Sequence, residues 1–511
     1  MKKISYFNLY ENRKMCVILF YANIFMHRKF VENLIFLLTL NIIVKPLWIF
    51  GIDLTVQNVV GEQVYGLYFA LFNFTIIFNC ILDFGINNFN SRSIAQSENF
   101  LQESFSKIFT LKLLLGVVYF VVVMLSSLIW RYKGYALWLL LLLTFNQFLS
   151  CFILYLRSNL SGLLLFKTDS FLSVIDRVIM ITICGILLWG NVVNEPFRIE
   201  WFVYSQTTAY IITILIALPI VLSHTKLHSP FVDIACFKQI LKQSIPFALL
   251  ALMTNLHNRI DAVFLERLLP EGIGSAQAGV YASAFRLLDA ATMIAYLFSV
   301  ILLPLFSNML AKNENVKTIF KTAFSLIFVY GFLLAMTAFN YNAELMSWLY
   351  NGHVEESSRV FGWLMLSIVP LSATYVFGSL LTAKGEMKKL NMIAFTAVIL
   401  NILLNLLLIF RFQAIGSAVA SLCTQCFIII AEAVLVIKIF GFSVSRRTVV
   451  KISVLAAISA LVIFISHNWR FHWMWNLCIS LILSVIAACL MGMINIKQTI
   501  QYYVSKKNDV N

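Results

Sequence analysis

Long runs of apolar residues recur along almost the whole chain, and they constrain its fold more than any other feature. A helix needs about 20 mostly apolar residues to cross the bilayer core of about 30 Å. Hydrocarbon offers no hydrogen bonds to an open backbone, so such runs cross it as helices. Of the 511 residues, 61% are hydrophobic and 12% are charged, whereas soluble domains are nearer half apolar and a quarter charged. The sequence therefore predicts an all-α polytopic membrane protein.

We expect about fourteen transmembrane helices, arranged as two six-helix lobes and a C-terminal helix pair. The spans of the first lobe are expected at residues 31–51, 62–84, 106–130, 135–156, 170–190 and 201–222. Those of the second lobe are expected at residues 243–265, 277–308, 317–339, 358–380, 391–410 and 414–437. The final pair is expected at residues 451–467 and 473–494.

The basic residues indicate the orientation of these spans. Lys and Arg collect in cytoplasmic loops, which is the positive-inside rule. When the N-terminus is placed in the cytoplasm, most of the 38 Lys and Arg residues fall in loops on that side. Both termini are therefore expected to be cytoplasmic. The net charge of +15 is spread over these short loops, so we expect no nucleic-acid partner.

An internal repeat relates the two predicted lobes. Ile52-Asp53, at the end of the first span, recurs as Ile260-Asp261 at the end of the seventh. The next spans align Gly66 with Gly279 and Tyr68 with Tyr281, and the polar loops SRSIAQSEN and SNMLAKNEN follow them. Six spans separate the two copies, so both enter the membrane in the same direction. Transporters built from such parallel repeats have an axis along the membrane normal and bind substrate between the halves.

The repeat and the loops predict five regions. They are a basic cytoplasmic extension at residues 1–30, a first lobe at 31–222, a cytoplasmic linker at 223–242, a second lobe at 243–440, and the last helix pair with the tail at 441–511.

Motifs for catalysis, cofactors or metals are lacking in the sequence. The nine cysteines are scattered, and the CxxC pair Cys423 and Cys426 lies within an apolar helix, where packing between helices explains it better than redox or metal chemistry. The chain has no phosphate-binding Gly-rich loop, HExxH motif or nucleophile elbow. We therefore expect a protein that is not an enzyme and needs no cofactor and no metal.

Ionisable residues lie inside several predicted spans, where each costs roughly 2.5–3.5 kcal/mol and so faces a bundle interior or a watery cavity. The stretch 244–311 holds most of them. They are His257, Arg259, Asp261, Arg286 and Asp289, and Lys45 lies in the first span. At 1.5 Å per residue, the three cations fall on one level, roughly 9–10 Å from the outer face.

Several segments together resemble a known family. SIPF at 244–247, NRID at 258–261, AGVYASAFRLLD at 278–289 and LLPLFSNML at 302–310 resemble the second half of the oligosaccharide flippases. The segment 61–96, with a Gly-x-Tyr and a later Gly followed by a polar stretch, resembles their first half. These Wzx-like polysaccharide biosynthesis proteins belong to the multidrug/oligosaccharidyl-lipid/polysaccharide exporter superfamily.

The resemblance implies a flippase in the bacterial plasma (inner) membrane. Its cargo would be an undecaprenyl-pyrophosphate-linked oligosaccharide repeat unit for O-antigen (lipopolysaccharide), capsule or exopolysaccharide, moved by alternating access. Its partners would be this lipid-linked oligosaccharide, membrane lipid, a glycan polymerase and a chain-length regulator. Three alternatives stay open: a lipid II flippase, a cation-coupled drug exporter of the same superfamily, and a multi-pass glycan polymerase.

The intramembrane charges then receive candidate roles. Lys45, Arg259 and Arg286 are expected to bind the pyrophosphate, because a doubly charged group needs several fixed cationic donors. His257, Asp261 and Asp289 are considered for ion coupling. Helix geometry allows Arg286 to pair with Asp289 and places His257 and Asp261 on one face. Glu432, near the inner end of its span, is expected to reach the membrane interface.

Overall fold

The computed structural model describes residues 39–493, except residues 42, 191, 193–194, 227–233, 443–445, 468 and 470–471. The predicted extension at residues 1–30, part of the linker and the C-terminal tail lie outside the described residues. Within the described ranges every regular element is a helix and no strand occurs. The predicted all-α membrane fold is confirmed.

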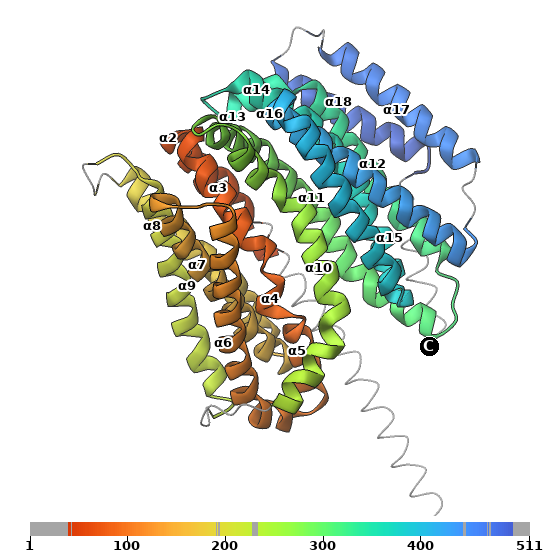
Figure 1. Ribbon diagram of the computed structural model, residues 1–511. Coiled ribbons are helices and arrows are strands. Elements are labelled where there is room, and N and C mark those ends of the chain that lie inside the picture. Colours follow the sequence, from red (N-terminus) through yellow and green to blue (C-terminus); the bar gives the residue numbers. More distant parts are fainter. Residues whose placement is uncertain are drawn as a thin grey trace, which may run out of the picture.

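The N-terminal bundle holds the elements coloured red to yellow-green in Figure 1. A short π-helix lies within its first helical span, Thr39–Val60. Helix–helix contacts of α7 with α3, α5, α8 and α9 hold the bundle together. Its elements are η1 (Leu47–Asp53), α2 (Leu54–Val60), α3 (Glu62–Ile77), α4 (Cys80–Asp83), α5 (Ile86–Gln96), α6 (Glu98–Ile129), α7 (Gly134–Gly162), α8 (Phe166–Trp189) and α9 (Ile199–Leu222).

The C-terminal bundle follows in green and blue, and the last two helices pack outside it against α12 (Figure 1). Its elements are α10 (Ile234–Leu268), α11 (Ile273–Ala311), α12 (Lys317–Asn340), α13 (Asn342–Leu349), α14 (Val354–Leu366), α15 (Ile368–Lys384) and α16 (Met387–Phe440). The outer pair is α17 (Arg446–His467) and α18 (Trp473–Leu490).

Ten of the described helices are long and apolar enough to cross a membrane, or eleven when the bent pair Glu62–Ile77 and Cys80–Gln96 is one span. The predicted number of fourteen is not confirmed and stays a prediction. The 54-residue α16 contains the two spans expected at 391–410 and 414–437, and its backbone leaves helical geometry between them, at Gln413 (φ 50°).

The two bundles meet where α3 crosses α11 without intervening side chains. A Cβ atom on Gly66 would lie 1.9 Å from the carbonyl oxygen of Ser275, and one on Gly279 would lie 2.1 Å from that of Glu62. Small residues let transmembrane backbones approach this closely. Gln57 also donates a hydrogen bond to the carbonyl oxygen of Gly279 (3.0 Å). This crossing lies at the end of the molecule that the basic residues assign to the outside.

Candidate functional site

An ion pair joins the two bundles just below the crossing. Nε of Arg286, on α11, lies 2.9 Å from Oδ2 of Asp53, the last residue of η1. The Tyr65 hydroxyl on α3 donates to the other carboxylate oxygen of Asp53 (2.8 Å) and accepts from Arg286 (3.3 Å). The Asp53 side chain is 2% exposed and that of Arg286 17%. The pair is thus almost fully desolvated and tied to both bundles.

A second arginine lies beside the first. Arg259, on α10, makes two contacts with the carboxylate of Asp289 on α11, at 3.0 and 3.5 Å. Its guanidinium lies over the ring of Phe285 (5.0 Å), while that of Arg286 lies over Phe69 (5.2 Å). These two rings touch each other edge to face, with centroids 6.0 Å apart. An aromatic pair therefore separates the two cations and holds both at the interface between the bundles.

Arg259 is the more accessible of the two arginines. Its side chain is 22% exposed, and that of Asp289 is 34% exposed. Both residues line a cavity of about 80 Å³ together with Ser421 and Gln425. A negatively charged group entering here would meet a guanidinium that already has the geometry for two parallel hydrogen bonds.

Arg286 and Asp289, whose spacing allows them to pair, do not pair with each other. Both residues lie on α11 at helical spacing that would allow it, but Arg286 reaches Asp53 and Asp289 binds Arg259 instead. Spacing along one helix limits which neighbours can pair. It does not reveal better-placed partners on other helices, and here both partners come from elsewhere in the fold.

Lys45 lies farther along the N-terminal bundle, facing α8. The charges that act on it are those of Arg177 and Asp176 on α8 and Arg157 on α7. It forms no ion pair with a described residue, and no described hydrogen bond joins it to Arg259 or Arg286. Arg177 packs over the ring of Trp48 (5.4 Å), one turn after Lys45. The charge of Arg177 interacts with that of Arg286 as well as with that of Lys45. Arg177 therefore links Lys45 to the arginine pair through charge interactions.

Asp261 repeats the environment of Asp53 inside the C-terminal bundle. The Tyr281 hydroxyl donates to it at 2.8 Å, as Tyr65 does to Asp53. The amides of Asn405 and Asn401 add hydrogen bonds of 2.8 and 3.2 Å. The sequence repeat aligns Tyr281 with Tyr68, but the hydrogen bonds make Tyr65 its counterpart.

These donors satisfy the fully buried Asp261 carboxylate within the protein. His257 does not join it: Nδ1 of the ring bonds to the Met253 carbonyl (2.8 Å). The two residues share a helix face, as expected, but have separate partners. Among the described residues no three His, Cys, Asp or Glu side chains form a metal-binding cluster.

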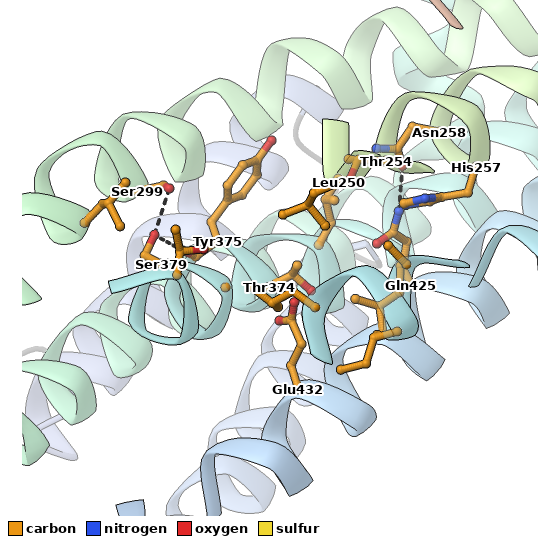
Figure 2. Close-up of a pocket in the computed structure, with 18 residues that line it drawn as sticks. Leu250, Thr254, His257, Asn258, Ser299, Thr374, Tyr375, Ser379, Gln425 and Glu432 are labelled. Carbon is orange, nitrogen blue, oxygen red and sulfur yellow. Dashed lines mark hydrogen bonds between the residues drawn. The ribbon is translucent and has the colours of Figure 1, made fainter. Parts of the chain in front are cut away.

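The expectation for Glu432 is wrong. Its side chain does not reach the membrane interface, because the residue is only 4% exposed and lines a cavity inside the C-terminal bundle (Figure 2). Glu432 lies eight residues before the end of α16. From the sequence alone, that position indicates a shallow depth in the membrane. Residues of α10, α11 and α15 line the same cavity and enclose the side chain there.

Comparison with known proteins identifies the fold and the family. The solved structure titled "Lipid II flippase MurJ, inward closed conformation" matches with a TM-score of 0.67 at 14% identity, over 91% of this chain and 100% of that chain. A multidrug resistance MATE family transporter of the MOP superfamily, inward-facing, matches with a TM-score of 0.59 at 15% identity, over 80% and 96%. A MOP superfamily transporter from Pyrococcus furiosus matches with a TM-score of 0.54 at 14% identity, over 79% and 94%.

The search of curated proteins gives no match. The family model described as "Polysaccharide biosynthesis protein" matches residues 30–310, which is more than half of the chain and includes the crossing of α3 and α11 and all the arginine and aspartate residues described between the bundles. The chain has the fold of MOP-superfamily transporters and belongs to the polysaccharide biosynthesis protein family.

Proposed function

We propose that the protein is a flippase that moves undecaprenyl-pyrophosphate-linked oligosaccharide repeat units, for O-antigen, capsule or exopolysaccharide, across a bacterial plasma membrane. The observation that carries this proposal is the arginine pair at the bundle interface. Arg286 is bound to a carboxylate of the opposite bundle, 2.9 Å away, and Arg259 lies next to it across the Phe69–Phe285 contact.

A pyrophosphate can replace both carboxylate partners. It offers more charge and more acceptor oxygens than Asp53 or Asp289, and arginine binds such oxygens in a bidentate manner. Binding it would release Arg286 from Asp53 and so break the ion pair between the bundles. Binding of the head group would thereby weaken the contact between the two bundles at the predicted outer end. That contact has to open before the cargo can leave on the outer side. Lys45, with Arg177 nearby, would extend the positive surface along the N-terminal bundle.

Alternating access follows from the two-bundle construction. The bundles would rock about the head-group site while the lipid tail stays in the bilayer through an opening at the side. The α17–α18 pair lies outside α12 and is proposed to border that opening. Both termini would be cytoplasmic, and a glycan polymerase and a chain-length regulator would take up the translocated product.

Two transport alternatives differ in cargo. A lipid II flippase would use the same arginines, and the MurJ structure shares the fold. A cation-coupled drug exporter would need free acidic groups facing its cargo. Asp53, Asp261 and Asp289 are all held by described side chains, and Glu432 lines a cavity inside the C-terminal bundle instead of the arginine site. The latter observation favours an anionic head group. A glycan polymerase is less favoured, because the family and the fold neighbours are transporters.

Reconstitution tests the proposal directly. The purified chain in proteoliposomes receives one of three cargoes: a fluorescent undecaprenyl-pyrophosphate oligosaccharide, lipid II, or the cationic dye ethidium. Appearance of the label in the opposite leaflet is measured with a membrane-impermeant quencher. We expect transport of the oligosaccharide lipid, and its loss in Arg259→Ala and Arg286→Ala.

Arg359→Ala is the matched control, because Arg359 is 64% exposed and, among the described residues, forms an ion pair only with its helix neighbour Glu355. This variant should transport at the wild-type rate. If only lipid II or only ethidium were transported, that compound would be the cargo and the proposed oligosaccharide lipid would not. Full activity in both interface variants would remove the arginine pair from the site.

A further inference from the structure

A larger cavity, of about 240 Å³, adjoins the arginine pair. It lies between α10, α11, α15 and α16 (Figure 2). Asn258 and Gln425 line both this cavity and the smaller one that contains Arg259. Along α10 the larger cavity is lined from Asn258 back to Leu250, so it extends from the arginine toward the predicted inner side. A group attached to an anion at Arg259 is thus close to this cavity.

The polar lining of the cavity consists of hydrogen-bonding groups with very little charge. Its main hydroxyl and amide residues are Thr254, Ser299, Thr374, Ser379, Thr382 and Gln425. Of the described residues that line it, Glu432 alone carries a formal charge. Hydroxyl and amide groups both donate and accept hydrogen bonds. The cavity therefore suits a neutral ligand that is rich in hydroxyl groups.

Two buried oxygens in this cavity receive no hydrogen bond from the described part of the chain. They are Oε2 of Glu432 and Oε1 of Gln425, whose Nε2 is already used to donate to Oδ1 of Asn258 (2.8 Å). A buried acceptor without a donor destabilises a protein, and a buried carboxylate does so most. A ligand that completes this cavity therefore has to bring hydrogen-bond donors.

The α11 side of the cavity borders the space between the two bundles. Val300 lies about four turns from Arg286 on the same face of α11, toward the predicted inner side. It is 50% exposed, so the N-terminal bundle leaves this part of the helix uncovered. Tyr296, also on α11, is 53% exposed and meets the ring of Tyr375 edge to face (6.1 Å). A ligand between the bundles can therefore reach Tyr375 and the cavity behind it.

We propose that this cavity binds the first sugar ring of the lipid-linked oligosaccharide while the pyrophosphate lies at Arg259. The inference rests on the proposed function and adds a site for a second part of the same cargo. The first sugar is the ring in question, because it is bonded directly to the pyrophosphate. Sites for drug-sized ligands measure about 300–1,000 Å³, so this smaller cavity fits one ring and not the whole repeat unit.

Each part of the ring has a matching group in the cavity. Its hydroxyl groups would donate to Glu432 and Gln425, which lack donors. Its C–H face would pack on the ring of Tyr375, because the face of an aromatic ring is negative. A uronic acid would instead bring a second negative charge next to Glu432, and like charges repel strongly where water is excluded. Glu432 would therefore select a neutral first sugar.

Equilibrium binding to the purified full-length protein in detergent tests this site. The ligands are farnesyl pyrophosphate and the same lipid linked to N-acetylglucosamine, galactose or glucuronic acid, and isothermal titration calorimetry gives their dissociation constants. We expect at least one neutral sugar to strengthen binding about tenfold over the bare pyrophosphate, which is what one hydrogen bond to a charged group contributes. Glucuronic acid should give no such gain.

Two cavity variants make the result specific. Glu432→Gln removes the charged acceptor at nearly constant size. Gly378→Val fills the space beside it, since an added Cβ lies 3.6 Å from Oε1 of Glu432. In both variants the ratio of the affinities for the neutral-sugar lipid and the bare lipid should fall toward one. Glu355→Gln, at an exposed carboxylate, should leave that ratio unchanged.

The outcomes separate this site from the proposed function. If the wild type bound the bare lipid as tightly as both neutral-sugar lipids, or if both cavity variants kept the wild-type ratio, the sugar site would be overturned and pyrophosphate binding would stand. If the wild type bound none of these lipids, the proposed function would be overturned and the sugar site with it.

Discussion

Arg286 and Asp53 have both a structural and a functional role, and paired substitutions can separate the two. Removing one partner leaves a buried charge without compensation, which costs about 3–5 kcal/mol, whereas replacing both with neutral groups is often nearly neutral. We expect Asp53→Asn to lower the melting temperature markedly. The double variant Asp53→Asn/Arg286→Gln should recover most of it and still fail to transport.

Thermal unfolding and leaflet transport of the same preparations check this prediction. Recovery of both stability and transport in the double variant would mean that Arg286 serves only to hold the bundles together. The control is the exposed pair Glu355→Gln/Arg359→Gln, in which neither property should change because such pairs contribute little.

At the residue scale, the sequence identified the charged residues but not their partners. Arg259, Arg286 and Asp289 were all recognisable as costly charges inside apolar runs. Arg259 pairs with Asp289 on the neighbouring helix, but the partner of Arg286 is Asp53, more than 200 residues away in the chain. Asp53 carried one signal, its place in the repeat opposite Asp261. Arg177 lies beside Lys45 only in the folded structure, and nothing in its own segment links the two residues.

Among the elements, the crossing of α3 and α11 depends on two glycines. Any Cβ at Gly66 would overlap the Ser275 carbonyl and the backbone of Gly279, so the helices have to move apart. Such overpacking costs about 1–3 kcal/mol. We expect Gly66→Ala to loosen the outer contact and to expose Gln57, which is now 3% exposed.

A single cysteine at position 57 reports this change through its rate of reaction with a membrane-impermeant maleimide. The rate should rise when Gly66→Ala is added to Gln57→Cys. Gly51→Ala is the matched control, because no heavy atom lies within 4 Å of its added Cβ. An equal rate in both backgrounds would show that the crossing tolerates the methyl group.

Helix boundaries were predictable where an apolar run is interrupted by polar or charged residues. The break between the spans at 391–410 and 414–437 was expected, and the backbone departs from helical geometry at Gln413. The π-helical segment that ends at Asp53 was not expected, since its residues are as apolar as those of an ordinary span. Helix hydrophobicity specifies burial in lipid but does not distinguish α from π geometry.

On the scale of the whole molecule, contacts between the bundles gather at the predicted outer end. Besides the glycine crossing, the Asn58 side chain donates to the Leu349 carbonyl (2.8 Å) and accepts from the backbone N–H of Asn351 (3.3 Å). The Tyr132 hydroxyl donates to Glu266 (3.1 Å), and Arg267 lies over its ring (3.6 Å). The two bundles are thus closed on one side by contacts that are individually weak and together define one state.

If the carrier works by alternating access, fixing this closed side has to stop it. In a variant whose nine native cysteines are replaced by Ala, cysteines at positions 58 and 351 can be joined by a short, reducible bis-maleimide. We expect cross-linking to abolish leaflet transport and reduction to restore it, because release on that side needs the two bundles to separate. A pair at positions 355 and 359, one turn apart on α14, should cross-link without any loss of transport. If the joined 58–351 protein still transported, the bundles would not need to part at this end, and cargo would have to pass by a route that leaves the outer contact closed.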